Sequence, residues 1–474
     1  MAAIGAGGAV ALSIVAAAAC FWPGVPMYDT LAQYRQVLGG PVDDWHPPVM
    51  VRLWQLLHSL GPGTTPMFVL QVALYAAGFG LIVAALVRTG RWWAAIFVTL
   101  LALSPLLLGW QMVVLKDSQM LGALLAAVGL VAWFRLRCRA IPWPVIAALV
   151  VLIAFATLLR GNAVFATVPL AVLLLPTRTK APISAVFMIA GTAAVVAISP
   201  VINHRLFRSG PSGIQNVQPV FDLAAIASAT PHSAPSPFTV EERALIVSRH
   251  CVKAYFWDPL GDPDACEDAT DRLMDEPARQ LWVDLAFAAA HHPVAYVSHR
   301  LAHWNSTERW LVAGGLPDAE PPTDAEPNDL GLAATESDFT ASVQQWADVE
   351  MATPLGWPIV WTVLALLLLP VAWHRRSDAA GSLAFALLAS AVALEASFLV
   401  ISIASDLRYH LWPMTASCLA LIVLSDGIRP IGWKRAVGAA AVAAVIFGGV
   451  FARASLPPAP DSYEGMLHAQ GNWL

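Results

Sequence analysis

Residues 65–109 read TPMFVLQVALYAAGFGLIVAALVRTGRWWAAIFVTLLALSPLLLG. Two apolar runs, 65–87 and 92–109, are separated there by a short link that carries Arg88 and Arg91. A helix needs about 20 predominantly apolar residues to cross roughly 30 Å of hydrocarbon. The stretch therefore predicts two membrane-spanning helices that are joined by a basic loop.

The rest of the chain has the same character. It contains 474 residues, of which 58% are hydrophobic and only 12% are charged, and its mean hydropathy is +0.63. Soluble domains usually carry about 25% charged residues, so lipid is the main solvent of this chain. We expect an all-α polytopic membrane protein with about eleven transmembrane helices, over the apolar runs 3–22, 65–87, 92–109, 119–134, 141–159, 163–176, 181–200, 354–373, 381–404, 411–425 and 434–452.

Basic residues fall in alternate connections between these runs. The positive-inside rule assigns such connections to the cytoplasm. We therefore expect a multi-pass protein of the cell inner (plasma) membrane, with a cytoplasmic N-terminus and with the other connections on the outer face. The basic connections carry Arg88 and Arg91; Arg135, Arg137 and Arg139; Arg178 and Lys180; Arg375 and Arg376; and Arg429, Lys434 and Arg435.

This orientation divides the chain into four parts. Residues 1–200 form an N-terminal transmembrane module of about seven helices, whose first outer loop, 24–64, is expected to carry interfacial helices. Residues 201–353 form an outer-face (periplasmic) segment, residues 354–452 form the C-terminal transmembrane helices, and residues 453–474 form an outer-face tail.

The outer segment 201–353 contains one stretch, 281–304, that is apolar enough to suggest a further span. Polar groups in hydrocarbon cost several kcal/mol, so we expect an interfacial amphipathic helix there instead. The polar residues that oppose a span are Asp284, His291, His292 and Arg300.

Two other features of the outer segment can be interpreted. Residues 316–340 are acidic and rich in proline, which is typical of a loop. Cys251 and Cys266 are the two cysteines in a hydrophilic segment. They form either two free thiols or a disulfide, and a disulfide requires an oxidising compartment.

The first outer loop offers a candidate catalytic carboxylate, Asp29. It follows Tyr28 at the start of a helix-compatible run, close to a membrane exit where a lipid head group would lie. The alternative is a structural carboxylate that interacts with the positive end of the helix dipole. The later stretch Trp45-His46-Pro47-Pro48 is also compatible with a rigid turn before a helix over 49–60, because proline is favoured at a first helical position.

Three further outer connections each hold a cation at the end of a span. Lys116 either pairs with Asp117 at the interface or binds a phosphate. The other two connections are either solvated turns or parts of one anion site at membrane depth, which would suit a lipid phosphate. The connections read Lys116-Asp117-Ser118, Arg160-Gly161-Asn162 and Ser405-Asp406-Leu407-Arg408-Tyr409-His410.

In these residues the chain resembles the GT-C superfamily of integral-membrane glycosyltransferases, which use polyprenyl-phosphate-linked sugars. Relatives include the protein O-mannosyltransferases and the lipid A aminoarabinose transferase. Lys116-Asp117 and Arg160-Gly161-Asn162 are similar to motifs of uncharacterised bacterial branches. The matching pattern is an Asp soon after the first helix (Asp29), a His-Pro-Pro element (His46, Pro47, Pro48), a large outer segment with interfacial helices, and a late Arg-Tyr element (Arg408, Tyr409) before a closing span.

The resemblance covers the first 200 residues and residues 405–413. The chain lacks the Asp-Glu pair of the mannosyltransferases, which leaves open which carboxylate acts. Asp44, just before Trp45-His46-Pro47-Pro48, resembles the Asp that precedes a Pro-Pro element in some relatives. It is the second candidate.

The resemblance implies transfer of a sugar from a polyprenyl-phosphate donor to a cell-envelope acceptor at the outer face of the membrane. Asp29 or Asp44 would act as general base on an acceptor hydroxyl. The leaving lipid phosphate would be stabilised by a clamp of cations. The clamp would consist of Lys116, Arg160 and Arg408, supported by Tyr28, His46, Asp117, Asn162 and Tyr409.

No cofactor is expected, although relatives differ over metal use and Asp29 with Asp44 would be the pair to hold a divalent metal. The expected partners are the donor, an envelope acceptor and membrane lipids, without nucleic acid. The chain has no P-loop, dinucleotide fingerprint, Gly-x-Ser-x-Gly elbow or His-Glu-x-x-His pattern, so nucleotide donors, serine hydrolysis and a zinc site have no support.

The alternative functions are a lipid or polysaccharide transporter or flippase without transferase activity, and a non-catalytic assembly subunit. Transporters more often place charges near the membrane midplane, on broken helices, and show internal repeats. Here the charges lie at span ends and no repeat is visible.

The predicted orientation can be tested by cysteine labelling and reporter fusions in intact cells. Because the basic connections are held on the cytoplasmic side, we expect probes in 201–353 to be reached only from outside. Probes at Arg375 and Arg376 should be reached only from inside. Labelling of residues 240–350 from the cytoplasm would contradict both the topology and the enzyme hypothesis.

Overall fold

The computed structural model describes residues 1–175, 181–233, 236–322, 324–425, 433–460 and 462–468. These residues form α-helices, short turns and three isolated bridges, and no β-strand is found among them. Arg178, Lys180 and Arg429 lie outside the described residues, as do the end of the outer tail and the side chains of Lys434 and Arg435.

Each predicted apolar run lies on an apolar helix or, for 92–109, on a pair of helices. Among the described residues, seven helices are long and apolar enough to cross a membrane, or eight if the bent pair α5–α6 is one span. Helices α8, α9 and α17 are apolar but shorter. The helices are α1 (Ala2–Cys20), α4 (Thr65–Arg88), α5 (Trp92–Ala102), α6 (Pro105–Met112), α7 (Lys116–Arg135), α8 (Trp143–Leu158), α9 (Val164–Leu174), α10 (Ala181–Val201), α17 (Pro358–His374), α18 (Ala379–Ser397), α19 (Leu411–Leu424) and α20 (Trp433–Ser455).

The bend between α5 and α6 has a local cause. The two helices meet at 49°, directly before Pro105, and the residue before a proline is disfavoured in helical conformation. Glu350 stabilises the break, because its carboxylate accepts from the Ser104 hydroxyl (2.9 Å) and from the Leu106 N–H (3.1 Å). A negative charge at the start of α6 also suits the helix dipole.

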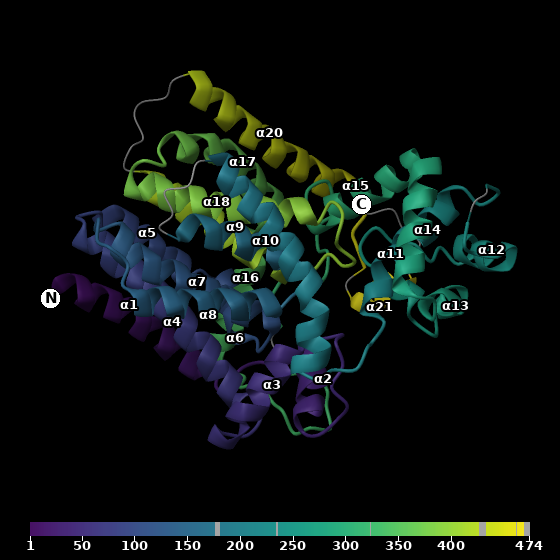
Figure 1. The fold of residues 1–474 in the computed structure, drawn as a ribbon, viewed down its shortest axis with the longest axis horizontal. Helices are drawn as coiled ribbons and strands as arrows, with labels where there is room; N and C mark the ends of the chain where they lie inside the picture. The colour runs from purple at the N-terminus through teal and green to yellow at the C-terminus, as the bar shows by residue number, and fades with distance from the viewer. Residues whose placement is uncertain (176–180, 234–235, 323, 426–432, 461, 469–474) are drawn as a thin grey trace.

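The remaining helices lie in the connections that the sequence places outside. The first outer loop contains α2 (Tyr28–Val37) and α3 (Pro48–Leu57), with Pro48 at the first helical position. Figure 1 shows α11–α14 and α21 gathered beyond one end of the long helices. The later helices are α11 (Ile214–Ala229), α12 (Val240–Ser248), α13 (Asp271–Met274), α14 (Ala278–His291), α15 (Pro293–Thr307), α16 (Asp338–Ala352) and α21 (Tyr463–His468).

The outer segment has its own small core. Phe221 on α11 and Leu281 on α14 are fully buried in a hydrophobic cluster that is separate from the core of the long helices. Cys251 and Cys266 are joined by a disulfide beside this cluster, with 5.9 Å between their Cα atoms. Of the two alternatives left open by the sequence, the structure thus has the disulfide.

Residues 281–304 are not one helix, contrary to the prediction. They are divided between α14 and α15, because Pro293 follows His292 and a proline favours a helix boundary at the preceding residue. Arg300 is only 4% exposed. It pairs with Asp222 (3.2 Å) and donates to the Leu399 carbonyl (3.1 Å), so Arg300 joins α15 to α11 and to the chain after α18.

Where they are described, residues 316–337 contain no helix, so most of the loop predicted over 316–340 is confirmed; its last three residues belong to α16, which begins at Asp338. Residues 316–337 cross over the first outer loop. Trp110 Nε1 donates to the Ala319 carbonyl (3.1 Å), and the Glu326 N–H donates to the Pro26 carbonyl (3.2 Å). This strap therefore links α6 to the chain just before α2.

At the other end of the bundle, arginines bind the last carbonyl groups of neighbouring helices. Arg375 Nη1 donates to the Leu424 carbonyl at the end of α19 (3.1 Å). Arg135 Nη2 donates to the Leu174 carbonyl at the end of α9 (2.6 Å). These carbonyls have no partner within their helix, and a cation at a helix C-terminus also suits the dipole.

The packing of α1 against α4 gives a testable prediction. A Cβ atom on Gly7 would collide with the Gly80 carbonyl oxygen, whereas a Cβ on the adjacent Gly8 meets nothing within 4 Å. Gly7→Ala is therefore expected to lower the free energy of unfolding by roughly 1–3 kcal/mol. Thermal unfolding in detergent measures the effect, and Gly8→Ala is the matched control. Equal effects of the two substitutions would contradict the packing.

Candidate functional site

The candidate site lies where α2 meets the start of α7. Val25 forms a short parallel bridge with the chain before α7, and its carbonyl accepts from the Val114 N–H (3.0 Å). The Thr30 hydroxyl donates to the Val114 carbonyl (2.7 Å). These bonds fix the first turn of α2 against the first turn of α7, which brings Asp29 to Lys116.

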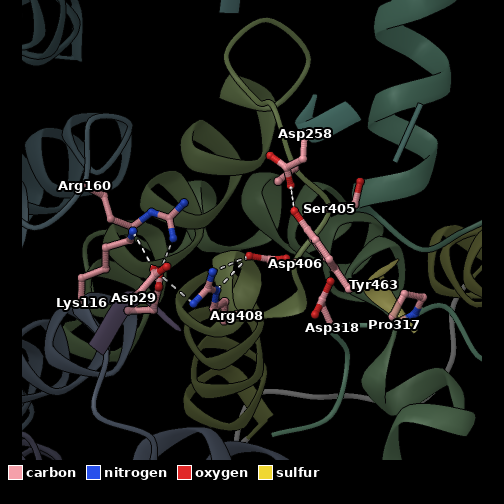
Figure 2. A network of polar contacts seen from close by, with 12 residues as sticks. Asp29, Lys116, Arg160, Asp258, Pro317, Asp318, Ser405, Asp406, Arg408 and Tyr463 are labelled. Atoms are coloured by element: carbon pink, nitrogen blue, oxygen red, sulfur yellow. Dashed lines mark hydrogen bonds and ion pairs between the residues drawn. The ribbon is translucent and has the colours of Figure 1, made fainter. Parts of the chain in front are cut away.

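Two cations converge on one carboxylate oxygen in this site. Lys116 Nζ lies 2.9 Å from Asp29 Oδ2, and Arg408 Nη1 lies 3.3 Å from the same oxygen (Figure 2). The three side chains are between 11% and 16% exposed, so little water screens the ion pairs. Arg408 comes from the short helical turn Leu407–His410 before α19, and the pairs therefore join three distant parts of the chain.

A second ion pair lies beside the first. Arg160, between α8 and α9, pairs with Asp117 on the first turn of α7, and its Nε donates to Asn162 Oδ1 (3.3 Å). Its guanidinium carbon lies 3.8 Å from the centroid of the Tyr409 ring, and that of Arg408 lies 5.6 Å from the same centroid. The aromatic ring therefore contacts both guanidinium groups of the cluster.

Asp406 is a member of the site that the sequence analysis did not single out. Its Oδ2 accepts from Arg408 Nε (2.9 Å) and Nη2 (2.7 Å). The only signal available was its position two residues before Arg408. With it, three carboxylates and three cations balance in charge. The balanced groups are Asp29, Asp117 and Asp406 with Lys116, Arg160 and Arg408.

Burial and the neighbouring charges shift the pKa of the Asp29 carboxyl in opposite directions. Burial alone raises this pKa, but the charges of Arg408 and Lys116 outweigh burial and hold the pKa well below its ordinary value. Burial and the charge of Lys116 lower the pKa of the neighbouring His46 to about 4. At neutral pH the site thus contains an ionised Asp29 and an uncharged His46.

Two of the predicted residues have other surroundings. Asp44 Oδ1 accepts from the backbone N–H and the hydroxyl of Ser212, both at 2.7 Å, and Oδ2 lies 3.4 Å from His204 Nε2. Asp44 therefore ties the first outer loop to the chain before α11. Tyr28 is 66% exposed at the start of α2.

Within the part of the chain that the structure describes, no three His, Cys, Asp or Glu side chains are arranged to hold a metal ion. Asp29 and Asp44, the pair that would hold one, are bound by different partners: cations in one case and Ser212 in the other.

A second group of carboxyls lies beyond Asp406 (Figure 2). The Tyr463 hydroxyl of α21 donates to Asp258 (2.6 Å), and the Tyr255 hydroxyl donates to Asp318 (2.8 Å). Burial raises the pKa of Asp258 and of Asp318 to about 6, against these hydrogen bonds, and the negative charge of Asp406 adds to the rise.

No protein-family model and no curated protein matches this chain. The resemblance to the GT-C superfamily therefore remains a proposal, and its support is the geometry of the cluster around Asp29. Ion pairs and stacking join six of the predicted site residues: Asp29, Lys116, Asp117, Arg160, Arg408 and Tyr409.

The raised pKa of Asp258 predicts that the region around it, including α21, is more stable in acid. The carboxyl binds a proton near pH 6 in the folded protein, but only near its ordinary pKa of about 4 when this region unfolds. The stabilisation is therefore complete below about pH 4 and is lost as the pH rises through about 6. Hydrogen exchange of α21, corrected for the intrinsic rate, should show about tenfold greater protection at pH 5 than at pH 7.5.

Asp258→Asn is the control for this measurement, because an amide does not titrate. Its α21 protection should change less between the two pH values, and the remaining change is due to Asp318, whose pKa is also raised to about 6. Protection of the unaltered protein that increases with pH would contradict the assignment.

Proposed function

We propose that this chain is a GT-C-type membrane glycosyltransferase that transfers a sugar from a polyprenyl-phosphate donor at the outer face of the inner membrane. The observation that carries the proposal is the convergence of Lys116 and Arg408 on one oxygen of Asp29. Lys116 begins α7 and Arg408 lies in the turn before α19, so both cations would lie near the membrane surface if these helices cross it. Preorganised cations of this kind stabilise a phosphate oxygen as negative charge develops on it.

Two features support placing the site outside. The basic connections lie at the opposite end of the bundle, where Arg135 and Arg375 bind helix carbonyls. The disulfide between Cys251 and Cys266 belongs to the segment on the side of the site, and disulfides persist in oxidising compartments. With eleven spans, both features agree with a cytoplasmic N-terminus.

Donor binding would change the partners of Asp29. A phosphate that binds Lys116 and Arg408 takes the place of the Asp29 carboxylate. Burial then dominates at Asp29, and its pKa rises. The carboxylate thus becomes a stronger base only when the donor is present, which couples donor binding to activation of the acceptor.

The transfer step follows from this arrangement. An acceptor hydroxyl oxygen attacks the anomeric carbon of the sugar, while its proton passes to Asp29. The bond between the anomeric carbon and the phosphate oxygen breaks, and the lipid phosphate leaves with the electron pair. Lys116 and Arg408 stabilise the charge on that phosphate. No strong acid is required, because the leaving group is a phosphate.

Arg160 has a different role in this proposal from that of Lys116 and Arg408. Arg160 forms an ion pair with Asp117. Its guanidinium group stacks on the Tyr409 ring, which also contacts Arg408. We therefore assign Arg160 and Tyr409 to positioning Arg408 rather than to direct contact with phosphate.

The test compares two carboxylates of the first outer loop. Asp29→Asn is expected to lower the rate of transfer from a labelled polyprenyl-phosphate sugar by about 100-fold or more, because it removes the general base. Binding of undecaprenyl phosphate should persist. Asp44→Asn is the matched control, since its amide oxygen can still accept from Ser212, and it should retain activity.

The outcomes separate the alternatives. Loss of transfer with Asp44→Asn but not with Asp29→Asn would contradict the assigned base. Movement of a lipid across the bilayer by unaltered protein, without transfer of label to any envelope acceptor, would favour the transporter or flippase.

A further inference from the structure

Helix α2 carries a buried polar face that the phosphate site does not use. Asp29, Gln33 and Gln36 are 9%, 1% and 7% exposed. At 3.6 residues per turn, these positions fall within an arc of about 60° and extend about 10 Å along the helix. Thr30 and Tyr34 point in other directions, where they bond to the chain before α7 and to the loop after α3. We call Asp29, Gln33 and Gln36 the polar stripe of α2.

The stripe holds hydrogen-bonding atoms without partners. Both amide atoms of Gln33 and Oε1 of Gln36 are buried, and neither side chain finds a partner for them among the described residues. The Nδ1 atom of His46 is also buried without a hydrogen-bond partner among the described residues. The charges of Asp29 and Lys116 act on this imidazole. A buried polar atom left unpaired costs about 1–3 kcal/mol, and such atoms are few in folded proteins.

The chemistry of these atoms defines the group that would satisfy them. An amide offers donors and an acceptor, and the uncharged imidazole offers one of each. A hydroxyl both donates and accepts, so it pairs with any of them. Asp29 is the one charged member of the stripe, and the two glutamines cannot neutralise a charge on a ligand. Burying an unpaired charge is far more costly than burying a hydroxyl.

We propose that the polar stripe of α2, together with His46, binds the hydroxyl groups of an uncharged sugar. This inference rests on the proposed function, and it specifies the substrate class. The stripe begins at Asp29, next to the two cations that would hold the phosphate, and the sugar of the donor is bonded directly to that phosphate. Gln33 and Gln36 therefore determine which sugar is accepted, while Lys116 and Arg408 bind the part common to all donors.

The experiment measures binding of three lipids to the purified full-length protein in detergent. They are undecaprenyl phosphate, its neutral hexose derivative undecaprenyl-phospho-mannose, and its cationic amino-sugar derivative undecaprenyl-phospho-4-amino-4-deoxyarabinose. Gln33→Leu removes two hydrogen-bonding atoms and keeps an apolar side chain of similar size. It should weaken binding of the mannose lipid about five- to tenfold and leave binding of undecaprenyl phosphate unchanged.

Gln218→Leu is the matched control. Gln218 is a buried glutamine on α11, in the outer segment, and its Oε1 also has no hydrogen-bond partner among the described residues. This substitution should change binding of none of the three lipids. Thermal unfolding of both variants identifies any general loss of structure.

Each result decides between the proposals. The inference is supported if the unaltered protein prefers the mannose lipid over the amino-sugar lipid and Gln33→Leu weakens the mannose lipid alone. It is overturned if Gln33→Leu weakens binding of the mannose lipid and of undecaprenyl phosphate equally, since the stripe would then not recognise the sugar. It is also overturned if Gln33→Leu changes binding of neither lipid, since the stripe would then hold ordered water only. Tighter binding of the amino-sugar lipid overturns the neutral class. Failure to bind any of the three lipids overturns the proposed function itself.

Discussion

The buried carboxylate of Asp29 is the interaction on which the outer end of the helix bundle depends. It binds Lys116 at the start of α7 and Arg408 before α19, so it connects three parts of the chain that are far apart in sequence. A buried charge is tolerated only with partners, and removing one partner leaves an uncompensated charge. The position of α2, the meeting of the two cations and the protonation state of the Asp29 carboxyl are therefore determined together.

Much of this site could be predicted because a membrane confines span ends to one plane. Lys116, Arg160 and Arg408 follow or precede apolar runs on the same side, so their proximity could be inferred without knowing the fold. Their pairing could not be inferred, since it depends on which helices are neighbours. Asp44 is an example of what the sequence could not predict. It is close to Asp29 in the sequence, but the path of the loop places it beside Ser212.

The fold was predictable where composition alone decides it, as in the apolar runs. The fold was less predictable where tertiary contacts determine the local structure. The run 381–404 ends as a helix at Ser397, because carbonyls beyond that point accept from the buried Arg300. The small core around Phe221 also lacked a sequence signal, since its residues come from short helices in different parts of the outer segment. Asp406 and Gln33 were missed because a single polar residue looks the same whether it is solvated or buried.

The arginines at the other end of the bundle have a consequence for how this protein could change in evolution. Arg135 and Arg375 belong to the basic connections from which the positive-inside rule predicts the orientation, and they also close the ends of α9 and α19. A chain that lost these charges would weaken the predicted orientation and at the same time leave helix carbonyls without partners. Inversion in the membrane and loss of stability are thereby linked in one mutational step. Replacement by lysine keeps the charge but loses the forked geometry, so it would separate the two effects.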